Sequence, residues 1–222
     1  MEYQQNQTFT GEYEDTYNYS FHKLMRMFTI SLLISFVGTL VGTRVDPVLM
    51  FPLVIVQLVM IFASMFIRRR GKPIGYAFTY IFCFISGITL YSVIGAYVSR
   101  GAGATVTTAL LLTVLIFVGL SVYAYNSKRD FSFLGGILMV GLFALIGLSL
   151  IGLFLPGLND GVMGLAISFA GILIFSGFIL YDISRYKHGV PDEMIPLAVL
   201  SLYLSFINLF LYLLQFLGLS RD

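Results

Sequence analysis

Seven apolar runs of about 20 residues, separated by short polar or charged links, constrain this chain more than any other feature. A membrane helix needs roughly 20 apolar residues at a rise of about 1.5 Å each. The composition agrees, because 58% of the residues are hydrophobic and 11% are charged, whereas soluble domains average about 25% charged residues. The sequence therefore predicts an all-α membrane protein. The expected spans are Leu24 to Gly42, Pro47 to Ile67, Ile74 to Val98, Ala104 to Tyr125, Phe131 to Phe154, Gly161 to Asp182 and Met194 to Gly218.

The polar ends of the chain are expected to lie outside this helical domain. Residues 1–23 are rich in Gln, Asn, Thr, Tyr and Glu without a helical apolar stripe, so we expect a mobile tail. Residues 24–218 form the seven-helix domain and residues 219–222 a short C-terminal tail. The polar, partly acidic start does not resemble a cleavable signal peptide.

The basic residues predict the orientation in the membrane. With seven spans, the N-terminus shares one side with the second, fourth and sixth links, and ten of the 13 Lys and Arg residues fall on that side. These ten are Lys23, Arg26, Arg68, Arg69, Arg70, Lys72, Lys128, Arg129, Arg185 and Lys187. The positive-inside rule then places the N-terminus in the cytoplasm and the C-terminus outside.

Composition also argues against several classes of function. No basic patch with interleaved aromatic residues supports nucleic-acid binding. A metal centre of cysteine and histidine is not expected, because Cys83 is the single cysteine and both His22 and His188 lie outside the spans. We expect no enzyme, because no second aspartate in a span could complete an acid pair with Asp182 and no histidine lies in a span as a base. No cofactor is expected either.

The sixth predicted helix ends in a carboxylate. Small and aromatic residues recur on one face of this helix at steps of three and four. They are Gly164, Ser168, Gly171, Phe175, Phe178 and Asp182. The other acidic residues lie in tails or links, so Asp182 alone falls within membrane depth. An ionisable residue there is a candidate functional site.

The seventh predicted helix carries a polar stripe at the same spacing. Its members are Ser201, Ser205, Asn208, Tyr212 and Gln215. Because exposing a polar stripe to lipid costs free energy, the stripe should face a protein interior or a water-filled cavity. We therefore expect the seventh helix to be central and Asp182 to point toward it.

Two alternatives remain open on these residues. The stripe could hydrogen-bond one helix to another without forming a conduit. Asp182 could be a solvated group at the cytoplasmic interface, paired with Arg185 three residues further on.

At these residues the chain resembles the Bax inhibitor family, also called transmembrane Bax inhibitor motif proteins. The resemblance covers about Met25 to Leu217. The segments that carry it are Ser86 to Leu90 (SGITL), Leu180 to Asp182 (LYD), Ser201 to Leu204 (SLYL) and Phe206 to Phe210 (FINLF). It implies six helices around a central seventh. It also implies a pH-sensitive calcium leak, across the plasma membrane in bacteria or across internal membranes in eukaryotes.

The resemblance further implies roles for particular residues. In calcium-leaking members, two aspartates from the sixth and seventh helices share a proton and gate the pore. Asp182 matches the first aspartate, but Ser205 stands at the position of the second. A glutamate of the second span pairs with an arginine in such members; Arg68 matches the arginine, and Gln57 stands for the glutamate. A carboxylate facing a hydroxyl cannot share a proton as two carboxylates do, and Asp182 alone offers calcium a weak site.

Two functions follow as hypotheses. The first is a membrane protein that mediates or modulates Ca²⁺ or other cation homeostasis through the polar seam between helices six and seven. Asp182, Ser205 and Asn208 would then sense ions or pH. Candidate gating or pore-lining residues are Arg68, Gln57, Ser201, Tyr212 and Gln215. The alternative is a non-conducting regulator that binds other membrane proteins, such as a protease or a stress-response partner. A bacterial plasma membrane is the expected location, with the lipid bilayer as the surrounding partner.

Overall fold

The structure, a computed structural model, describes residues 2–69, 73–152, 154–155, 157–158 and 160–220, without the side chains of residues 2–18, 65, 68 and 69. Its helices are α1 (Glu2–Gly42), α2 (Met50–Arg69), α3 (Tyr76–Ser99), α4 (Gly103–Asn126), α5 (Leu134–Gly152), α6 (Gly161–Tyr186) and α7 (Ile195–Leu219). Short 3₁₀ turns, η1 (Pro47–Leu49) and η2 (Asp192–Met194), precede α2 and α7. Within the described residues, seven helices are long and apolar enough to cross a membrane. The predicted all-α membrane class is confirmed.

The helix ends differ from the predicted ones by a few residues, for local reasons. α5 begins at Leu134 rather than Phe131, because the Asp130 carboxylate accepts a hydrogen bond from the Ser132 backbone N–H at 2.8 Å and a turn precedes the helix. α6 continues one turn beyond Asp182, to Tyr186. Asp182 is therefore followed by one further helical turn and is not the last residue of α6.

The N-terminal segment differs from the prediction. We expected residues 1–23 to form a tail separate from the first span, whereas the helical backbone of α1 begins at Glu2. The expectation was based on the lack of an apolar stripe, and the part of α1 apolar enough to cross a membrane begins only at Tyr19. That this segment is mobile stays a prediction.

The chain divides into two compact units, and α7 contributes to both. Unit 1 comprises Met1–Gly95 and Tyr186–Tyr203, and unit 2 comprises Ala96–Arg185 and Leu204–Asp222. α7 is the most buried of the spans, with 61% of its span buried, and α2 is the least, with 6%. The central position of the seventh helix, with six helices around it, stays a prediction.

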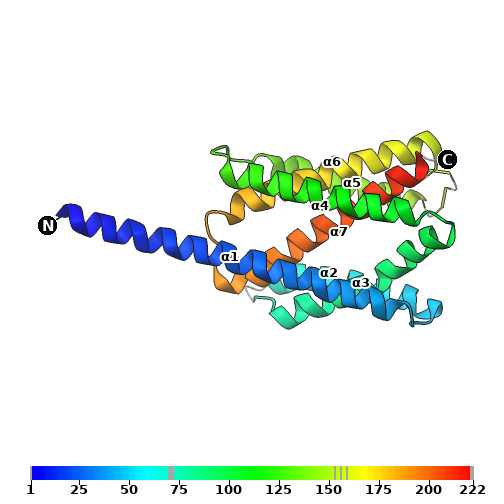
Figure 1. Cartoon of the computed structure of the whole chain (residues 1–222), viewed down its shortest axis with the longest axis horizontal. Helices are drawn as coiled ribbons and strands as arrows, with labels where there is room; N and C mark the ends of the chain where they lie inside the picture. The colour runs from blue at the N-terminus through cyan, green and yellow to red at the C-terminus, as the bar shows by residue number, and fades with distance from the viewer. Residues whose placement is uncertain (1, 70–72, 153, 156, 159, 221–222) are drawn as a thin grey trace. The chain divides into compact units, whose positions relative to one another are not determined.

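In unit 1, small residues allow α1 and α3 to run alongside each other (Figure 1). A Cβ atom on Gly87 of α3 would overlap the backbone carbonyl of Ser35, and one on Gly38 of α1 would overlap the carbonyl of Phe84. Such close backbone approach favours association where apolar attraction between helices is weak. The fully buried Tyr203 of α7 shares a hydrogen bond of 2.7 Å with the Ser35 hydroxyl. This bond fastens the first half of α7 to α1.

In unit 2, α5 and α6 approach each other through glycines in the same way. A Cβ atom on Gly141 would lie 2.8 Å from Cδ1 of Ile174, and one on Gly177 would lie 2.6 Å from Cδ2 of Leu138. The second half of α7 packs on α4 through Phe206, whose ring meets Phe117 edge-on at 5.5 Å. These contacts place α7 where its polar stripe can meet α5 and α6.

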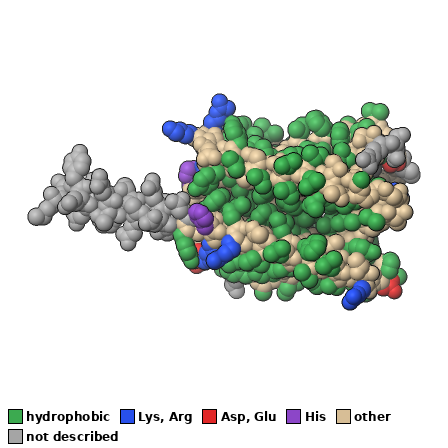
Figure 2. Space-filling model, viewed as in Figure 1, with side chains coloured by type: hydrophobic (Ala, Val, Ile, Leu, Met, Phe, Trp, Pro, Cys, Tyr) green, Lys and Arg blue, Asp and Glu red, His purple; other side chains and the backbone are tan. Residues whose placement is uncertain are grey.

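Hydrophobic side chains cover the flanks of the helices in Figure 2, while charged side chains lie at helix ends. Many large apolar residues are more than half exposed, for example Phe51 at 73%, Phe143 at 63% and Leu115 at 67%. A water-soluble protein rarely exposes such continuous apolar surface. The surface is therefore that of a protein surrounded by lipid.

Candidate functional site

Five of the six residues of the expected face of α6 are buried, Asp182 among them, and Phe178 is half-buried. Gly164, Ser168, Gly171, Phe175 and Asp182 are all buried, and Asp182 is only 3% exposed. Asp182 is therefore not a solvated group, while its depth in the membrane and its pairing with Arg185 stay predictions. A buried carboxylate is costly unless it is neutralised, paired or hydrogen-bonded, so its surroundings are the natural place to look for function.

Aromatic contacts set the register between α6 and α7. The Phe175 and Tyr212 rings stack at 5.7 Å with an interplanar angle of 22°, and the Phe169 and Phe216 rings lie 6.2 Å apart. Ascending numbers on α6 thus meet descending numbers on α7, so the two helices are antiparallel.

This register relates Asp182 to Ser205. Asp182 lies seven residues beyond Phe175 on α6, and Ser205 lies seven residues before Tyr212 on α7. Seven residues are about two turns in both helices, so the carboxylate and the hydroxyl lie at the same depth. Ser205 is 4% exposed, which makes both groups part of the buried seam of unit 2.

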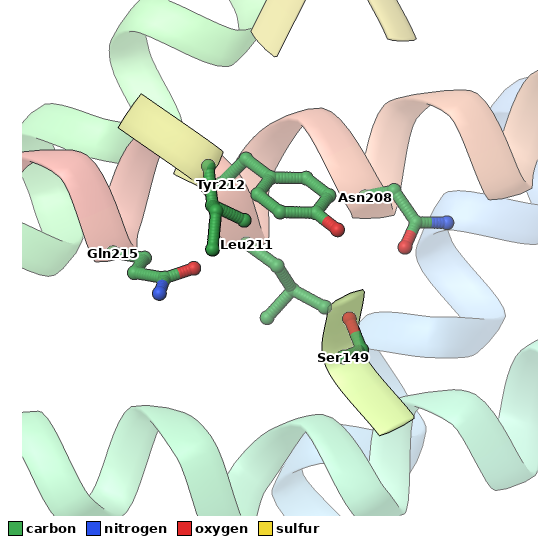
Figure 3. Close-up of a pocket in the computed structure, with 6 residues that line it drawn as sticks. Ser149, Asn208, Leu211, Tyr212 and Gln215 are labelled. Carbon is green, nitrogen blue, oxygen red and sulfur yellow. The ribbon is translucent and has the colours of Figure 1, made fainter. Parts of the chain in front are cut away.

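A polar cavity of about 280 Å³ lies next to this seam within unit 2. Figure 3 shows Asn208, Tyr212 and Gln215 of α7 around it, together with Ser149 of α5. Leu211 and Ile167 complete the lining. The Asn208 amide donates to the Leu204 carbonyl at 2.7 Å, which leaves its own oxygen as an acceptor. The cavity thus offers hydroxyl and carboxamide groups and no charge.

The tyrosine of this cavity is seated in a notch. A Cβ atom on Gly171 would overlap the Tyr212 ring, so only glycine allows the ring to lie against α6. The Ser149 hydroxyl of α5 is close enough to interact with the Tyr212 phenol. Tyr212 therefore links all three helices that line the cavity.

The remaining predicted residues are not among the described side chains that line this cavity. Gln57 donates to the Thr89 hydroxyl at 3.2 Å and joins α2 to α3 in unit 1. Ser201 is half-buried and also belongs to unit 1. The side chain of Arg68 lies outside the described residues. Arg185, proposed as a partner of Asp182, donates to the Tyr181 hydroxyl at 3.1 Å and lies 5.5 Å from the centre of that ring.

The described carboxylates do not gather as a calcium site would require. Among the described residues, no group of three or more His, Cys, Asp or Glu side chains could hold a metal ion together. Calcium prefers six to eight oxygen ligands with several carboxylates. Asp182 as a metal ligand, and the absence of a cofactor or of enzyme activity, stay predictions.

Sequence reasoning missed two features, one in each unit of the chain. Ser149 was not considered, although it is the single polar side chain in the apolar sequence of α5, and that isolation was the available signal. The second feature is the buried cluster of unit 1, where Tyr203 bonds Ser35 and also lies 3.4 Å from the Cys83 carbonyl oxygen. Nothing in the order of the residues brings these three together.

Comparison with known proteins gives consistent matches along nearly the whole chain. Residues 18–222 match the family model described as "Inhibitor of apoptosis-promoting Bax1". The chain is 38% identical over 212 residues to the "Modulator of FtsH protease YccA" of Escherichia coli K12, covering 91% of this chain and 93% of that protein. The "Inner membrane protein YccA" of Escherichia coli O6:H1 matches to the same extent. Bax inhibitor 1 of Schizosaccharomyces pombe is 35% identical over 167 residues, which cover 75% of this chain and 60% of the yeast protein.

Proposed function

The chain is a multi-pass integral membrane protein of the Bax inhibitor family, and on this basis we propose that it is a membrane regulator that binds another membrane protein and modulates its activity. The FtsH protease is the first partner to test. The observation that carries the proposal is the 38% identity with a protein named as a modulator of that protease, over 93% of its length. A relative named as an inner membrane protein supports a bacterial plasma membrane as the location.

The residues of the seam favour a regulator over a gated channel. A proton-sharing switch needs two carboxylates close together in a medium of low dielectric constant, which raises the pKa of one of them. At the depth of Asp182 the seventh helix presents Ser205, and a hydroxyl does not titrate in this range. The described seam therefore buries Asp182 and Ser205 but lacks the second carboxylate that such a switch needs.

The proposal is tested by reconstitution with FtsH from the same organism. We expect FtsH to co-purify in a fixed ratio after mild solubilisation, and the degradation rate of a membrane substrate to change when the protein is added to proteoliposomes. An unrelated protein with seven membrane helices, at the same protein-to-lipid ratio, controls for crowding. Recovery of the protein alone, together with an unchanged degradation rate, would contradict the proposal.

Cation movement is the second candidate, favoured by the polar cavity and by buried Asp182. Its test is calcium flux into dye-loaded proteoliposomes at about pH 6 and about pH 8, comparing the wild type with Ser205→Asp. Because the substitution restores two facing carboxylates, it should create pH-dependent flux if the fold is a channel scaffold without its switch. If the wild type already conducts, Asp182 and the polar stripe are sufficient for cation movement without a second carboxylate. If neither protein conducts, the cation hypothesis fails and the regulator proposal is unaffected.

A further inference from the structure

The polar cavity of unit 2 lies close to one end of the helices that line it. Ser149 is three residues from the end of α5 at Gly152, and Gln215 is four residues from the end of α7 at Leu219. At about 1.5 Å per residue, Gln215 lies about 6 Å and Asn208 about 16 Å from the end of α7. Since the hydrocarbon core is about 30 Å thick, the cavity extends from near one membrane surface to about the midplane.

The lining determines what can occupy the cavity. Four of its six residues are polar, namely Ser149, Asn208, Tyr212 and Gln215, and none of the six is charged. Polar groups at membrane depth are costly without hydrogen-bond partners, so a cavity lined by them is not filled with lipid tails. A water needs only about 10–15 Å³ of such volume and two to four polar partners, and the cavity offers about 280 Å³. It is large enough and polar enough for several water molecules.

The inner end of the cavity stops short of the buried carboxylate. Asn208 is its deepest residue on α7, and Ser205 lies one turn further along the same face at 4% exposure. Asp182, at the depth of Ser205, is 3% exposed. About one helical turn of α7 therefore separates the cavity from the depth of Asp182 and Ser205.

We propose that this cavity is a water-filled vestibule that opens at the end where α7 finishes and admits small, uncharged, hydrogen-bonding solutes as far as Asn208. With the orientation predicted from the basic residues, it opens to the non-cytoplasmic side. Calcium is not its occupant, because divalent cations prefer carboxylate ligands and the lining has none. The inference goes beyond the proposed function and holds whether or not the protein modulates a protease.

Cysteine substitutions at neighbouring positions of α7 test the vestibule in the full-length protein. Asn208→Cys and Gln215→Cys place a thiol in the cavity, while Leu209→Cys and Leu213→Cys place one at similar depths on positions that are 0% and 5% exposed. N-ethylmaleimide, a small uncharged reagent, reacts with thiolates that form in water. We expect both cavity thiols to react at least about tenfold faster than their buried neighbours, because accessibility controls thiol reactivity.

The native cysteine serves as the internal control for folding. Cys83 is 0% exposed, so its thiol should stay unreactive in every folded variant and react only in a misfolded one. Folded Asn208→Cys and Gln215→Cys proteins that react as slowly as Leu209→Cys and Leu213→Cys would overturn the proposal. The side of the membrane to which the cavity opens is determined by labelling Gln215→Cys with a charged, membrane-impermeant thiol reagent. Labelling from the non-cytoplasmic side supports the proposed opening, and labelling from the cytoplasmic side alone overturns it.

Discussion

The notch at Gly171 allows a sharp test of how α6 and α7 pack. In Gly171→Ala the new methyl group would overlap the Tyr212 ring, so the ring must move and lose its stacking on Phe175 at 5.7 Å. Overpacking costs about 1–3 kcal/mol, and a lost aromatic pair costs about 0.5–1.5 kcal/mol. Replacing glycine in a helix returns about 0.5–1 kcal/mol. The free energy of unfolding should therefore fall by about 0.5–4 kcal/mol.

The chain offers a matched control on the adjacent helix. A Cβ atom on Gly147 of α5 would have nothing within 4 Å, so Gly147→Ala should leave the free energy of unfolding unchanged or raise it by up to about 1 kcal/mol. Both variants are compared with the wild type by equilibrium unfolding in mixed micelles. A second comparison introduces Gly171→Ala into a Tyr212→Ala background, where the ring that causes the overlap is absent.

Two results would refute this reasoning. The first is a Gly171→Ala protein as stable as Gly147→Ala, which would mean that α6 and α7 do not approach at Gly171. The second is an equal loss of stability with and without the Tyr212 ring, because neighbouring sites that share a contact must be coupled.

Three further predictions use the same unfolding measurement. Tyr203→Phe should lower the free energy of unfolding by about 1–3 kcal/mol, because it leaves the buried Ser35 hydroxyl without its 2.7 Å partner; an unchanged value would mean that the hydroxyl finds another partner. Gln57→Leu should change the free energy of unfolding by less than about 1 kcal/mol, because it removes one hydrogen bond between membrane helices, the bond to Thr89. A larger loss would contradict this. Gly87→Ala should lower stability more than Gly171→Ala does, since the new methyl group meets backbone rather than a side chain; the reverse order would contradict the close approach of α1 and α3.

The positions of the membrane helices could be predicted from the sequence with few errors. Long apolar runs predict membrane helices because the bilayer leaves no other way to satisfy the backbone. The same logic fails at the polar N-terminal segment, where no apolar stripe indicates a helix, yet the helical backbone of α1 begins at Glu2. Helix ends such as Leu134 depend on one local side-chain hydrogen bond, which spacing does not reveal.

The faces of α6 and α7 could also be predicted, because helical periodicity places residues three and four apart on one side. The burial of Asp182 follows that pattern. Periodicity does not say which helix lies opposite, so Ser149 could not be assigned to the cavity before α5 was placed beside α7. Likewise the resemblance makes Gln57 a candidate gating or pore-lining residue, but spacing does not reveal that it bonds Thr89 of α3.

The sequence by itself determined the class of the protein, its membrane spans and the polar and small-residue faces of its last two helices. Hydrophobicity and helical period are local properties, and each can be evaluated within one segment. Only the tertiary structure decided that the Tyr212 ring lies in the notch at Gly171, that Asp182 and Ser205 share one depth, and that Ser149 faces the stripe of α7. These relations depend on register and close packing between helices far apart in the chain, and many registers are compatible with the same pattern of apolar and polar residues.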